Sequence, residues 1–446
     1  MKFTLVSPPN PDNTGTFRPP VALATMAAVC RDRGHEPLIY DFEAMKLTSA
    51  TEMAELLLAD EPDVVGFSCM TPRYPIAVRT AEEIKKRSPE TVVVMGGVHI
   101  SGDPEGSLRS PAIDYIVVGE GEYPTVELLD ALEQGLSTDD IPNVGRMIDG
   151  VPHIQPVRPF IADLDELPFP AYDLLPLDLY LDDELFIDRY MGVMTSRGCA
   201  WNCIFCASNT IWKRKVRFHS AKRVVDELEE LVTRFGIREF YFYDDNFTVN
   251  RKRTLAICDD IIRRGLNIRF FIALRADTTD FEVVTALKNA GCFIAWLGVE
   301  SGDDEILKVI GKGVTREHII AASDVLREVG LPFFASYIFG HPGDTEETIE
   351  RTMEVARRVD ANYSKFFIAI PYPGTKLHAL AVERELIVPD DSRDLSRYHT
   401  YQNVVANFST LSDEELMARQ TSAYEEFDLR KKPVAPPTSH PNQAQK

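Results

Sequence analysis

Residues 197–206 read Arg197-Gly198-Cys199-Ala200-Trp201-Asn202-Cys203-Ile204-Phe205-Cys206, and they place three cysteines in a CxxxCxxC pattern. Three thiolates within eight residues can converge on one point if the backbone wraps around it, as an iron–sulfur cluster requires. The other four cysteines are scattered, so no fourth cysteine lies nearby to close a four-cysteine site. One iron would be left open to a small molecule, and an open coordination position is typical of a reactive site.

Two other uses of these cysteines stay open at this point. A structural zinc ion could take His219 as its fourth ligand, although such sites usually pair CxxC with a second CxxC or with HxxxH, and the chain has neither. A disulfide between Cys203 and Cys206 is less favoured. The seven cysteines are odd in number and no signal peptide precedes them, which together indicate a reducing compartment.

The composition is that of a cytoplasmic protein of enzyme size. The 446 residues are enough for two or three domains, and 44% hydrophobic with 26% charged residues is ordinary for a globular chain. The net charge of -21 disfavours a nucleic acid or an anionic membrane as partner. No stretch approaches the length of a membrane-spanning helix, so we expect no membrane partner.

Residues 1–135 alternate short apolar runs with helical patterns. Runs that are apolar on both faces are typical of buried parallel strands with helices between them, so we expect a doubly wound, Rossmann-like α/β sheet. Such sheets bind ligands beyond the carboxyl ends of their strands, and glycines in those loops let the backbone approach a large ligand. Each glycine alone could simply turn a strand into a helix. The candidate ligand-binding residues are Ser68, Thr71, Gly96, Gly97, His99, Gly119, Glu120 and Gly121.

The rest of the chain divides into a linker, a second α/β domain and an end region. Residues 136–190 are rich in proline and acidic residues, which predicts a linker along the surface. Residues 191–380 hold six expected strands with helical crossovers, which predicts a partial (β/α)6 barrel of the TIM type. Residues 381–430 predict a small helical region, and the Pro-, Gln- and Asn-rich residues 431–446 predict a disordered tail.

Polar side chains follow the strands expected in the barrel, at the ends where such barrels place their chemistry. The three cysteines follow the first strand, and carboxylate, guanidinium, hydroxyl and imidazole groups follow the others. Each has a structural alternative: Asp244 or Asp245 could cap the next helix, and Arg275 could pair with Asp277. Together they indicate a small-molecule site around a metal cluster. The strand-end residues are Asp244, Asp245, Asn246, Arg275, Glu300, Ser301, His341 and Tyr372.

The cysteine stretch resembles the signature of the radical S-adenosylmethionine (SAM) enzymes, in which an aromatic residue, here Phe205, precedes the last cysteine. The resemblance covers most of the chain and points to one branch, in which a cobalamin (B12)-binding-type domain precedes the barrel. The barrel segments that resemble this branch are residues 243–248, 298–302, 339–345 and 371–375. The segments that resemble its N-terminal domain are residues 95–99 and 118–122.

The resemblance implies that Cys199, Cys203 and Cys206 bind three irons of a [4Fe–4S] cluster. The open iron would bind the amino and carboxylate groups of SAM, and Phe205 would lie near the adenine. Residues 244–246 would reach the methionine ammonium.

The resemblance also assigns the remaining strand ends. Arg275 would bind the SAM carboxylate, for which a guanidinium is well suited, and Glu300 or Ser301 would bind the ribose hydroxyls. His341 stands where relatives have an apolar residue, and with Tyr372 it is our candidate for a catalytic group that gives or takes a proton. An ordinary polar contact is the alternative for His341. The glycine-rich loops of residues 1–135 would contact cobalamin.

The function implied is a cobalamin-binding radical SAM enzyme that cleaves SAM reductively to a 5′-deoxyadenosyl radical. We expect a methyltransferase acting on an unactivated centre of a natural-product intermediate, with an electron donor such as flavodoxin or ferredoxin. One alternative is a radical SAM dehydratase, cyclase, epimerase or dehydrogenase without cobalamin. A non-catalytic corrinoid or metal sensor is an alternative of another class. The last alternative is an α/β protein that a structural zinc ion stabilises.

Overall fold

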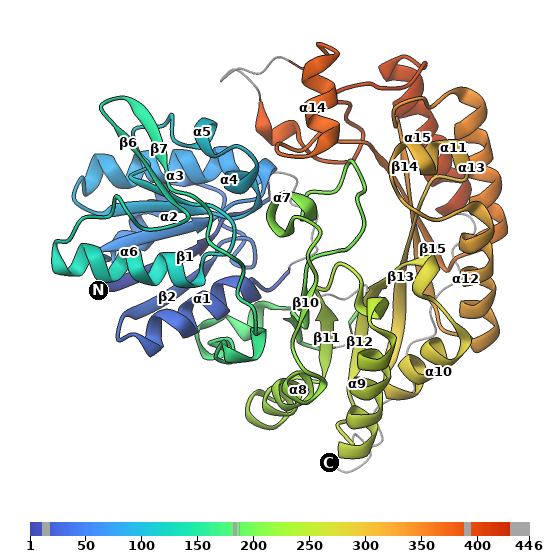
Figure 1. Cartoon of the computed structure of the whole chain (residues 1–446), viewed down its shortest axis with the longest axis horizontal. Coiled ribbons are helices and arrows are strands. Elements are labelled where there is room, and N and C mark those ends of the chain that lie inside the picture. Colours follow the sequence, from blue (N-terminus) through green and yellow to red (C-terminus); the bar gives the residue numbers. More distant parts are fainter. Residues whose placement is uncertain (11–17, 182–184, 187, 388–393, 429–446) are drawn as a thin grey trace.

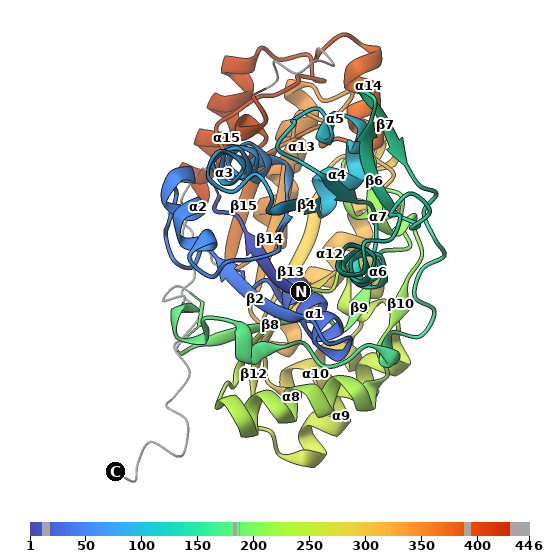
Figure 2. The ribbon, with the colours of Figure 1, turned by 90° about the vertical axis from the view of Figure 1, so that its left-hand side faces the viewer.

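Two large β-sheets, one from each half of the chain, organise the fold (Figure 1). The computed structural model describes residues 1–10, 18–181, 185–186, 188–387 and 394–428. The expected tail, residues 431–446, lies outside the described residues. Turned by 90°, the molecule presents the N-terminal sheet in front of strands β13, β14 and β15 of the second sheet (Figure 2). No helix in the described part of the chain is both long and apolar enough to cross a membrane.

The N-terminal sheet is the doubly wound, mostly parallel sheet expected from the sequence. Its strand order is β2-β1-β3-β4-β5-β6-β7, with β1 at the point where the order reverses. Val64 and Val65 are both fully buried, as neighbours on opposite faces of a covered strand must be. The parallel strands are β1 (Lys2–Ser7), β2 (Glu36–Asp41), β3 (Val64–Ser68), β4 (Val92–Gly96) and β5 (Tyr115–Val117). The helices are α1 (Val21–Asp32), α2 (Ala50–Leu58), α3 (Tyr74–Arg87), α4 (Val98–Gly102), α5 (Pro104–Ser107) and α6 (Glu122–Gln134), with the 3-10 turn η1 (Thr71–Arg73).

Two antiparallel strands extend this sheet and correct the boundary predicted between residues 135 and 136. β6 (Val144–Ile148) pairs with β5, and β7 (Val151–Ile154) pairs with β6. A two-residue turn joins them, with φ of 50° at Asp149 and 77° at Gly150, the conformation that a tight hairpin needs. The sequence prediction of a linker over residues 136–190 is therefore wrong for this hairpin. The frequent prolines suggested a linker, but Pro152 lies on an edge strand, where proline is tolerated.

The segment that follows the hairpin runs between the two sheets as short turns. They are η2 (Leu164–Glu166), η3 (Tyr172–Leu174) and η4 (Leu177–Leu179). Tyr172 donates a 2.5 Å hydrogen bond to Glu227, and Tyr180 donates one of 3.1 Å to Asp41, so buried side chains tie the segment to both domains.

The second sheet is a partial barrel of six parallel strands in the order β15-β14-β13-β12-β11-β8, as predicted. Its first and last strands do not pair, so the barrel is open. The strands are β8 (Tyr190–Val193), β11 (Glu239–Phe242), β12 (Arg269–Leu274), β13 (Cys292–Glu300), β14 (Phe333–Phe339) and β15 (Tyr363–Ile368). The helices on its outer side are α8 (Ala221–Phe235), α9 (Arg251–Arg264), α10 (Phe281–Ala290), α11 (Asp304–Val309), α12 (Arg316–Val329) and α13 (Glu346–Val359), with turns η5 (Phe247–Val249) and η6 (Ala276–Thr278).

The C-terminal region covers the open edge of the barrel at β15. It consists of α14 (Lys376–Glu383), η7 (Leu395–Arg397) and α15 (Asp413–Asp428), and is helical as expected. Tyr424 accepts a 3.1 Å hydrogen bond from the Phe366 N–H, and Gln420 donates one of 2.7 Å to the Phe366 carbonyl. Side chains of α15 therefore replace a neighbouring strand, and the edge is not left free to pair with another chain.

Candidate functional site

The cysteine loop, residues 198–207, lies between β9 (Ser196–Arg197) and α7 (Ser208–Trp212), directly after β8. β9 pairs with β10 (Arg217–Phe218), so the loop is closed at its base by a small ribbon. Cys199, Cys203 and Cys206 are all partly exposed and none forms a disulfide. The loop faces the N-terminal domain, because α7 contacts α4 (Figure 1).

The three thiols lie close enough together to influence one another. Burial, together with the charges of Asp245, Cys203 and Cys199, raises the pKa of Cys206 to about 12. Burial also raises the pKa of Cys199, to which Asp245 and Cys203 contribute. Thiols of high pKa are held as thiolates only when cations offset their charge, and bound iron ions do this.

The end of α11 and the start of α14 hold the cysteine loop in place. The Ile204 N–H donates to the Ile310 carbonyl at 2.9 Å, and the Ile204 carbonyl accepts from the Leu377 N–H at 2.9 Å. Gly311 lies so close that a Cβ there would sit 2.8 Å from the Asn202 carbonyl oxygen. The backbone of the loop is thus fixed before any metal binds, which lowers the cost of ordering it around a cluster.

The donor set fits an iron–sulfur cluster better than a single zinc ion. Among the described residues, no three His, Cys, Asp or Glu side chains are gathered as the ligands of one ion would be. Thiolates of a cluster bind different irons, so their sulfur atoms stand farther apart than the ligands of one ion. His219 instead bonds to Asp165 at 3.2 Å, and burial lowers its pKa to about 4. The structure therefore gives no support to zinc with His219 as a ligand.

A hollow lies over two of the cysteines and is rich in positive charge. Its empty volume is about 550 Å³, open solvent included, and Cys203 and Cys206 form part of its wall. Lys213, Arg214 and Lys376 line it as well. Cations beside the cluster position suit the negative charge of an iron–sulfur cluster and of a carboxylate that binds there.

Two of the strand-end residues predicted to bind SAM form hydrogen bonds with the protein itself. Asp244 is buried and accepts hydrogen bonds from the Thr195 N–H at 3.2 Å and from the Thr195 hydroxyl at 2.7 Å. Asn246 caps η5 through Thr248 and donates to Thr278 at 3.3 Å. Asp245 lies between them, exposed and next to the cysteines, and accepts a 2.6 Å hydrogen bond from Ser208.

Arg275 lies against the cysteine loop. Its guanidinium stands 4.0 Å from the centre of the Trp201 ring, and its charge lowers the pKa of Cys199. It also donates to Asp277 at 3.0 Å and to the Lys312 carbonyl at 2.6 Å. The pairing with Asp277 that the sequence left open is present, and it fixes the guanidinium beside the cluster position.

A buried ion pair marks the end of β13. Glu300 accepts a 2.8 Å hydrogen bond from the Lys312 ammonium, and both side chains are nearly buried. Glu300 has φ of 69°, a conformation rare outside glycine that is concentrated at functional sites. Ser301 closes the adjoining turn by accepting from the Asp303 N–H at 3.2 Å. Sequence reasoning missed Lys312, although Gly311 and Gly313 on either side were a signal of a tight loop.

His341 is fully buried, and neither of its ring nitrogens has a hydrogen-bond partner. Its ring lies 5.5 Å from that of Phe205 in the cysteine loop. Burial, with the Lys312 charge, lowers its pKa to about 3, so the ring is neutral at neutral pH. A buried neutral imidazole offers one donor and one acceptor, and leaving both unused is costly. The site therefore fits a ligand that carries polar groups of both kinds, as SAM does.

The other candidate catalytic residue, Tyr372, follows β15. Its ring centre lies 6.5 Å from that of Tyr398, and its carbonyl accepts a 2.6 Å hydrogen bond from Thr375 at the start of α14. The backbone of this segment also meets the N-terminal domain, because a Cβ on Gly102 would lie 2.3 Å from the Pro373 carbonyl oxygen.

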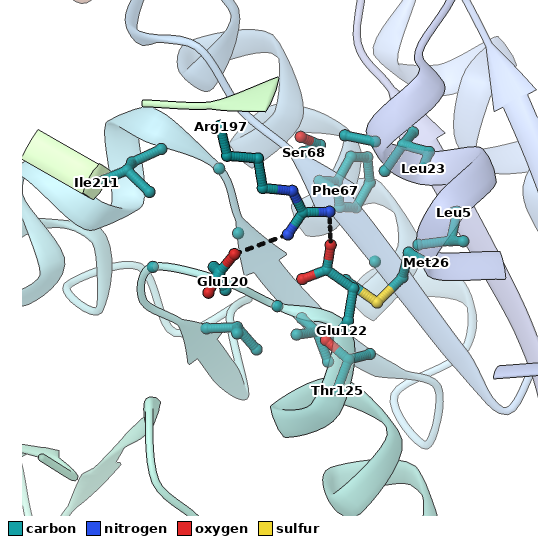
Figure 3. A pocket seen from close by; sticks show the side chains of 18 of the residues that line it. Leu5, Leu23, Met26, Phe67, Ser68, Glu120, Glu122, Thr125, Arg197 and Ile211 are labelled. Carbon is teal, nitrogen blue, oxygen red and sulfur yellow. Dashed lines mark hydrogen bonds and ion pairs between the residues drawn. The ribbon is translucent and has the colours of Figure 1, made fainter. Parts of the chain in front are cut away.

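A large pocket opens at the carboxyl edge of the N-terminal sheet (Figure 3). Its empty volume is about 860 Å³, open solvent included, and apolar side chains such as Leu23, Met26 and Phe67 form much of its wall. The predicted residues that line it are Ser68, Gly96, Gly97, Gly119, Glu120 and Gly121. An apolar pocket beneath a glycine-rich rim fits the large organic body of a corrinoid.

Two residues predicted for this site lie outside the pocket lining. Thr71 and His99 are buried and face each other, with His99 Nδ1 3.3 Å from the Thr71 hydroxyl. The His99 ring also packs on Tyr74, with 4.3 Å between the ring centres.

One wall of the pocket comes from the barrel domain. Arg197, two residues before Cys199, donates to Glu120 at 2.8 Å and to Glu122 at 2.5 Å (Figure 3). Arg217 donates to Glu120 at 2.9 Å, and all four side chains are nearly buried. We call these residues the bridging ion cluster. It joins the loop that bears the cysteines to the rim of the N-terminal pocket.

Comparison with known proteins agrees with both halves of the site. Residues 193–356 match the model of the radical SAM superfamily, and residues 12–129 match that of the B12 binding domain. "Uncharacterized methyltransferase PH0819" of Pyrococcus horikoshii is 37% identical over 97% of this chain and 93% of its own length. The anaerobic magnesium-protoporphyrin IX monomethyl ester cyclase of Rubrivivax gelatinosus is 28% identical, over 93% of this chain and 74% of its own.

The solved structure of the radical SAM methyltransferase TsrM from Kitasatospora setae, with cobalamin and a [4Fe–4S] cluster bound, superposes with a TM-score of 0.75. The two chains are 20% identical, and the match covers 97% of this chain and 89% of the other, so it shows a shared fold. The cofactors of this class are a [4Fe–4S] cluster, SAM and cobalamin, and the residues described above fit all three. The chain belongs to the cobalamin-dependent radical SAM methyltransferase family.

Proposed function

We propose that this enzyme transfers a methyl group from SAM to an unactivated carbon or phosphorus centre of a small natural-product intermediate in the cytoplasm. The observation that carries the proposal is the bridging ion cluster. It makes Arg197, two residues from Cys199, part of the wall of the N-terminal pocket. A corrinoid in that pocket and a cluster on the cysteines would thus share one rigid support, as a reaction that uses both requires.

The residues of the chain hold and shield the reactants. When bound, the cluster supplies an electron, SAM the methyl and adenosyl groups, and the corrinoid carries the methyl group. Cys199, Cys203 and Cys206 hold the cluster. Arg275 and Asp245 stand beside it and bind the amino-acid end of SAM. The carboxylate oxygen of Glu300 that does not face Lys312 is available to a ribose hydroxyl. Lys312 fixes the position of Glu300 through their 2.8 Å ion pair. Trp201 and Phe205 exclude water from these groups.

The enzyme needs a reductant, and we propose a flavodoxin or ferredoxin. Lys213, Arg214 and Lys376 around the hollow over Cys203 and Cys206 support this, because a positive surface beside a cluster attracts an acidic electron carrier. Steering of this kind weakens with salt, so the rate of reduction should fall as ionic strength rises.

Product analysis under anaerobic conditions tests the function. The enzyme, reconstituted with iron, sulfide and hydroxocobalamin, is given methyl-labelled SAM, a reductant and candidate substrates. Formation of S-adenosylhomocysteine and 5′-deoxyadenosine together, with label in the substrate, is expected. An enzyme that keeps its cluster, retains no corrinoid and yields only 5′-deoxyadenosine would refute methyl transfer.

A second candidate is a radical SAM dehydratase, cyclase, epimerase or dehydrogenase. The similarity to the cyclase of Rubrivivax gelatinosus over 93% of this chain favours it over the remaining alternatives. It predicts 5′-deoxyadenosine without S-adenosylhomocysteine. A sensor without activity predicts neither product, so the same experiment separates all three.

His341 is proposed to bind or exchange a proton with the ligand over the cluster, and His341→Phe tests this. The phenyl ring fits the buried site but leaves polar groups of SAM without partners, so the SAM dissociation constant should rise about tenfold. Equilibrium binding to the reconstituted protein measures it. Because the His341 pKa is about 3, the affinity of the unaltered enzyme should not follow a histidine titration near neutral pH.

The matched control is His153→Phe, on the exposed face of β7. It should leave SAM affinity and cluster content unchanged. Unchanged SAM affinity and turnover in His341→Phe, with a full cluster, would show that the imidazole has no part in the site. Tyr372→Phe is examined in the same way, and only a fall in turnover with unchanged SAM affinity would support its proposed proton-transfer role.

A further inference from the structure

The inner face of the partial barrel carries a continuous belt of aromatic side chains. We call it the aromatic belt, and it consists of Tyr241, Phe271, Trp296, Phe334 and Tyr363, one from each of the strands β11 to β15. Neighbouring ring centres along it are 4.5, 6.3, 6.2 and 4.8 Å apart. The strand register places Tyr241 beside Phe271, Trp296 beside Phe334, and Phe334 beside Tyr363.

The belt lies opposite the helices. Side chains alternate between the two faces of a strand, and the neighbours Phe270 and Ala295 are fully buried in the core shared with the helices. Within the belt, Tyr241, Trp296 and Tyr363 remain partly exposed. Phe271 and Phe334 are buried between them, so the row offers three partly exposed rings, and partly exposed rings inside a barrel are suited to a ligand.

Small side chains follow the belt along three strands. Ala273, Gly298 and Ser336 stand two residues beyond Phe271, Trp296 and Phe334, on the same face and nearer the carboxyl ends. They occupy little volume between the belt and the next level, which holds Arg275 and Glu300. Ser336 also accepts a 2.9 Å hydrogen bond from the Trp296 indole, so the ring is fixed in orientation. Above Gly298 the space is taken by the Glu300 carboxylate and the Lys312 ammonium, which a Cβ there would meet at 2.6 and 2.9 Å, so a flat ligand would lie beside this pair, toward Tyr241.

Two cations flank the belt. The Arg18 guanidinium stands 5.1 Å from the ring centre of Tyr241, and the Lys365 ammonium stands 5.7 Å from that of Trp296. Arg18 is exposed, and no carboxylate pairs with it among the residues that the structure describes. The nearby Glu43 is taken by Arg73. A guanidinium at the end of an aromatic row, with no carboxylate paired to it among the described residues, is suited to an anionic group on a stacked ligand.

We propose that the methyl acceptor is a flat, π-electron-rich molecule that bears a carboxylate or phosphate. Its ring system stacks on the aromatic belt, and its anionic group pairs with Arg18. This assignment rests on the proposed function for the position of the reacting centre, which faces the cluster side. The class of molecule is inferred from the belt and the cations alone.

Binding of a defined probe tests the assignment without turnover. The probe is 2-anthracenecarboxylate, added to the full-length enzyme loaded with its cluster, SAM and cobalamin under anaerobic conditions. Quenching of tryptophan emission and probe fluorescence give its dissociation constant. Arg18→Met should weaken binding about tenfold, whereas Arg18→Lys should weaken it less because a positive charge remains. Ala273→Leu, which fills the space above the belt, should also abolish tight binding.

Comparison molecules and a control variant test which class of molecule the belt binds. Cyclohexanecarboxylate has the anion but no aromatic face, and 2-anthracenemethanol has the face but no anion, so both should bind about tenfold more weakly than the probe. Arg263→Met, which removes an exposed charge on α9, should change nothing. Equal binding of all three molecules, or an unchanged constant in Arg18→Met, would overturn the proposal.

The same preparations separate this inference from the proposed function. Formation of S-adenosylhomocysteine and 5′-deoxyadenosine is measured beside probe binding, and the thermal unfolding transition and iron content of Ala273→Leu show whether the variant is folded. Both products without selective probe binding would refute the substrate class and leave methyl transfer standing. Selective probe binding without S-adenosylhomocysteine would refute methyl transfer and leave the aromatic, anionic ligand standing.

Discussion

Cys203→Ala will abolish the [4Fe–4S] cluster and all cleavage of SAM. Two thiolates remain in the cysteine loop, and two protein ligands do not hold a cluster that normally has three or four. Iron after anaerobic reconstitution should fall from about four atoms per chain to nearly none. 5′-Deoxyadenosine should become undetectable. Metal analysis, the visible absorption of the cluster and product analysis measure the three effects.

The control is Cys258→Ala, which removes a buried thiol in α9, outside the cysteine loop. It should keep its iron and its activity at a modest cost in stability, because a small core cavity costs about 1 kcal/mol. Zinc in place of iron in the unaltered protein, or full SAM cleavage by Cys203→Ala, would contradict the cluster.

Gly96→Leu will abolish binding of cobalamin and spare the cluster. Gly96 lines the pocket at the end of β4, and a Cβ there would meet only the Val117 carbonyl oxygen, at 3.7 Å, within 4 Å. The backbone therefore accepts a side chain, and that of leucine would extend into space that the corrinoid needs. Affinity for hydroxocobalamin should fall by about 100-fold or more, since overlap of this size cannot be relieved in a packed wall.

Gly96→Ala is the matched control, because it adds one methyl group in ordinary van der Waals contact. It should bind hydroxocobalamin within a few-fold of the unaltered protein. Spectrophotometric titration gives the affinities, and iron content shows that the cluster is intact. Retention of hydroxocobalamin by Gly96→Leu would mean that the corrinoid binds elsewhere.

The sequence was most informative where chemistry and spacing coincide. The three cysteines and the glycine-rich strand ends are local signals, and the structure places all of them at the carboxyl edges of their sheets. Strand ends converge by topology, so the general location of a site follows from the order of strands and helices alone.

The sequence alone could not identify residues whose roles depend on partners far away along the chain. Arg197 is separated from Glu120 by 77 positions, and no local pattern connects them. Lys312 lies in a loop whose contact with the strand end at Glu300 exists only in the folded chain. Likewise Asp244 and Asn246 were rightly expected at a strand end. Their hydrogen bonds run to the protein itself, which a sequence cannot distinguish from bonds to a ligand.

The bridging ion cluster limits how this enzyme can be divided. Separated after the linker, the N-terminal half would keep Glu120 and Glu122 without their arginines, and the barrel would keep Arg197 and Arg217 without their carboxylates. Removing one side of a buried ion pair costs more than the pair contributes when whole. The two halves are therefore not interchangeable modules. A corrinoid domain taken from a relative would serve this barrel only if it brought both carboxylates in the same place.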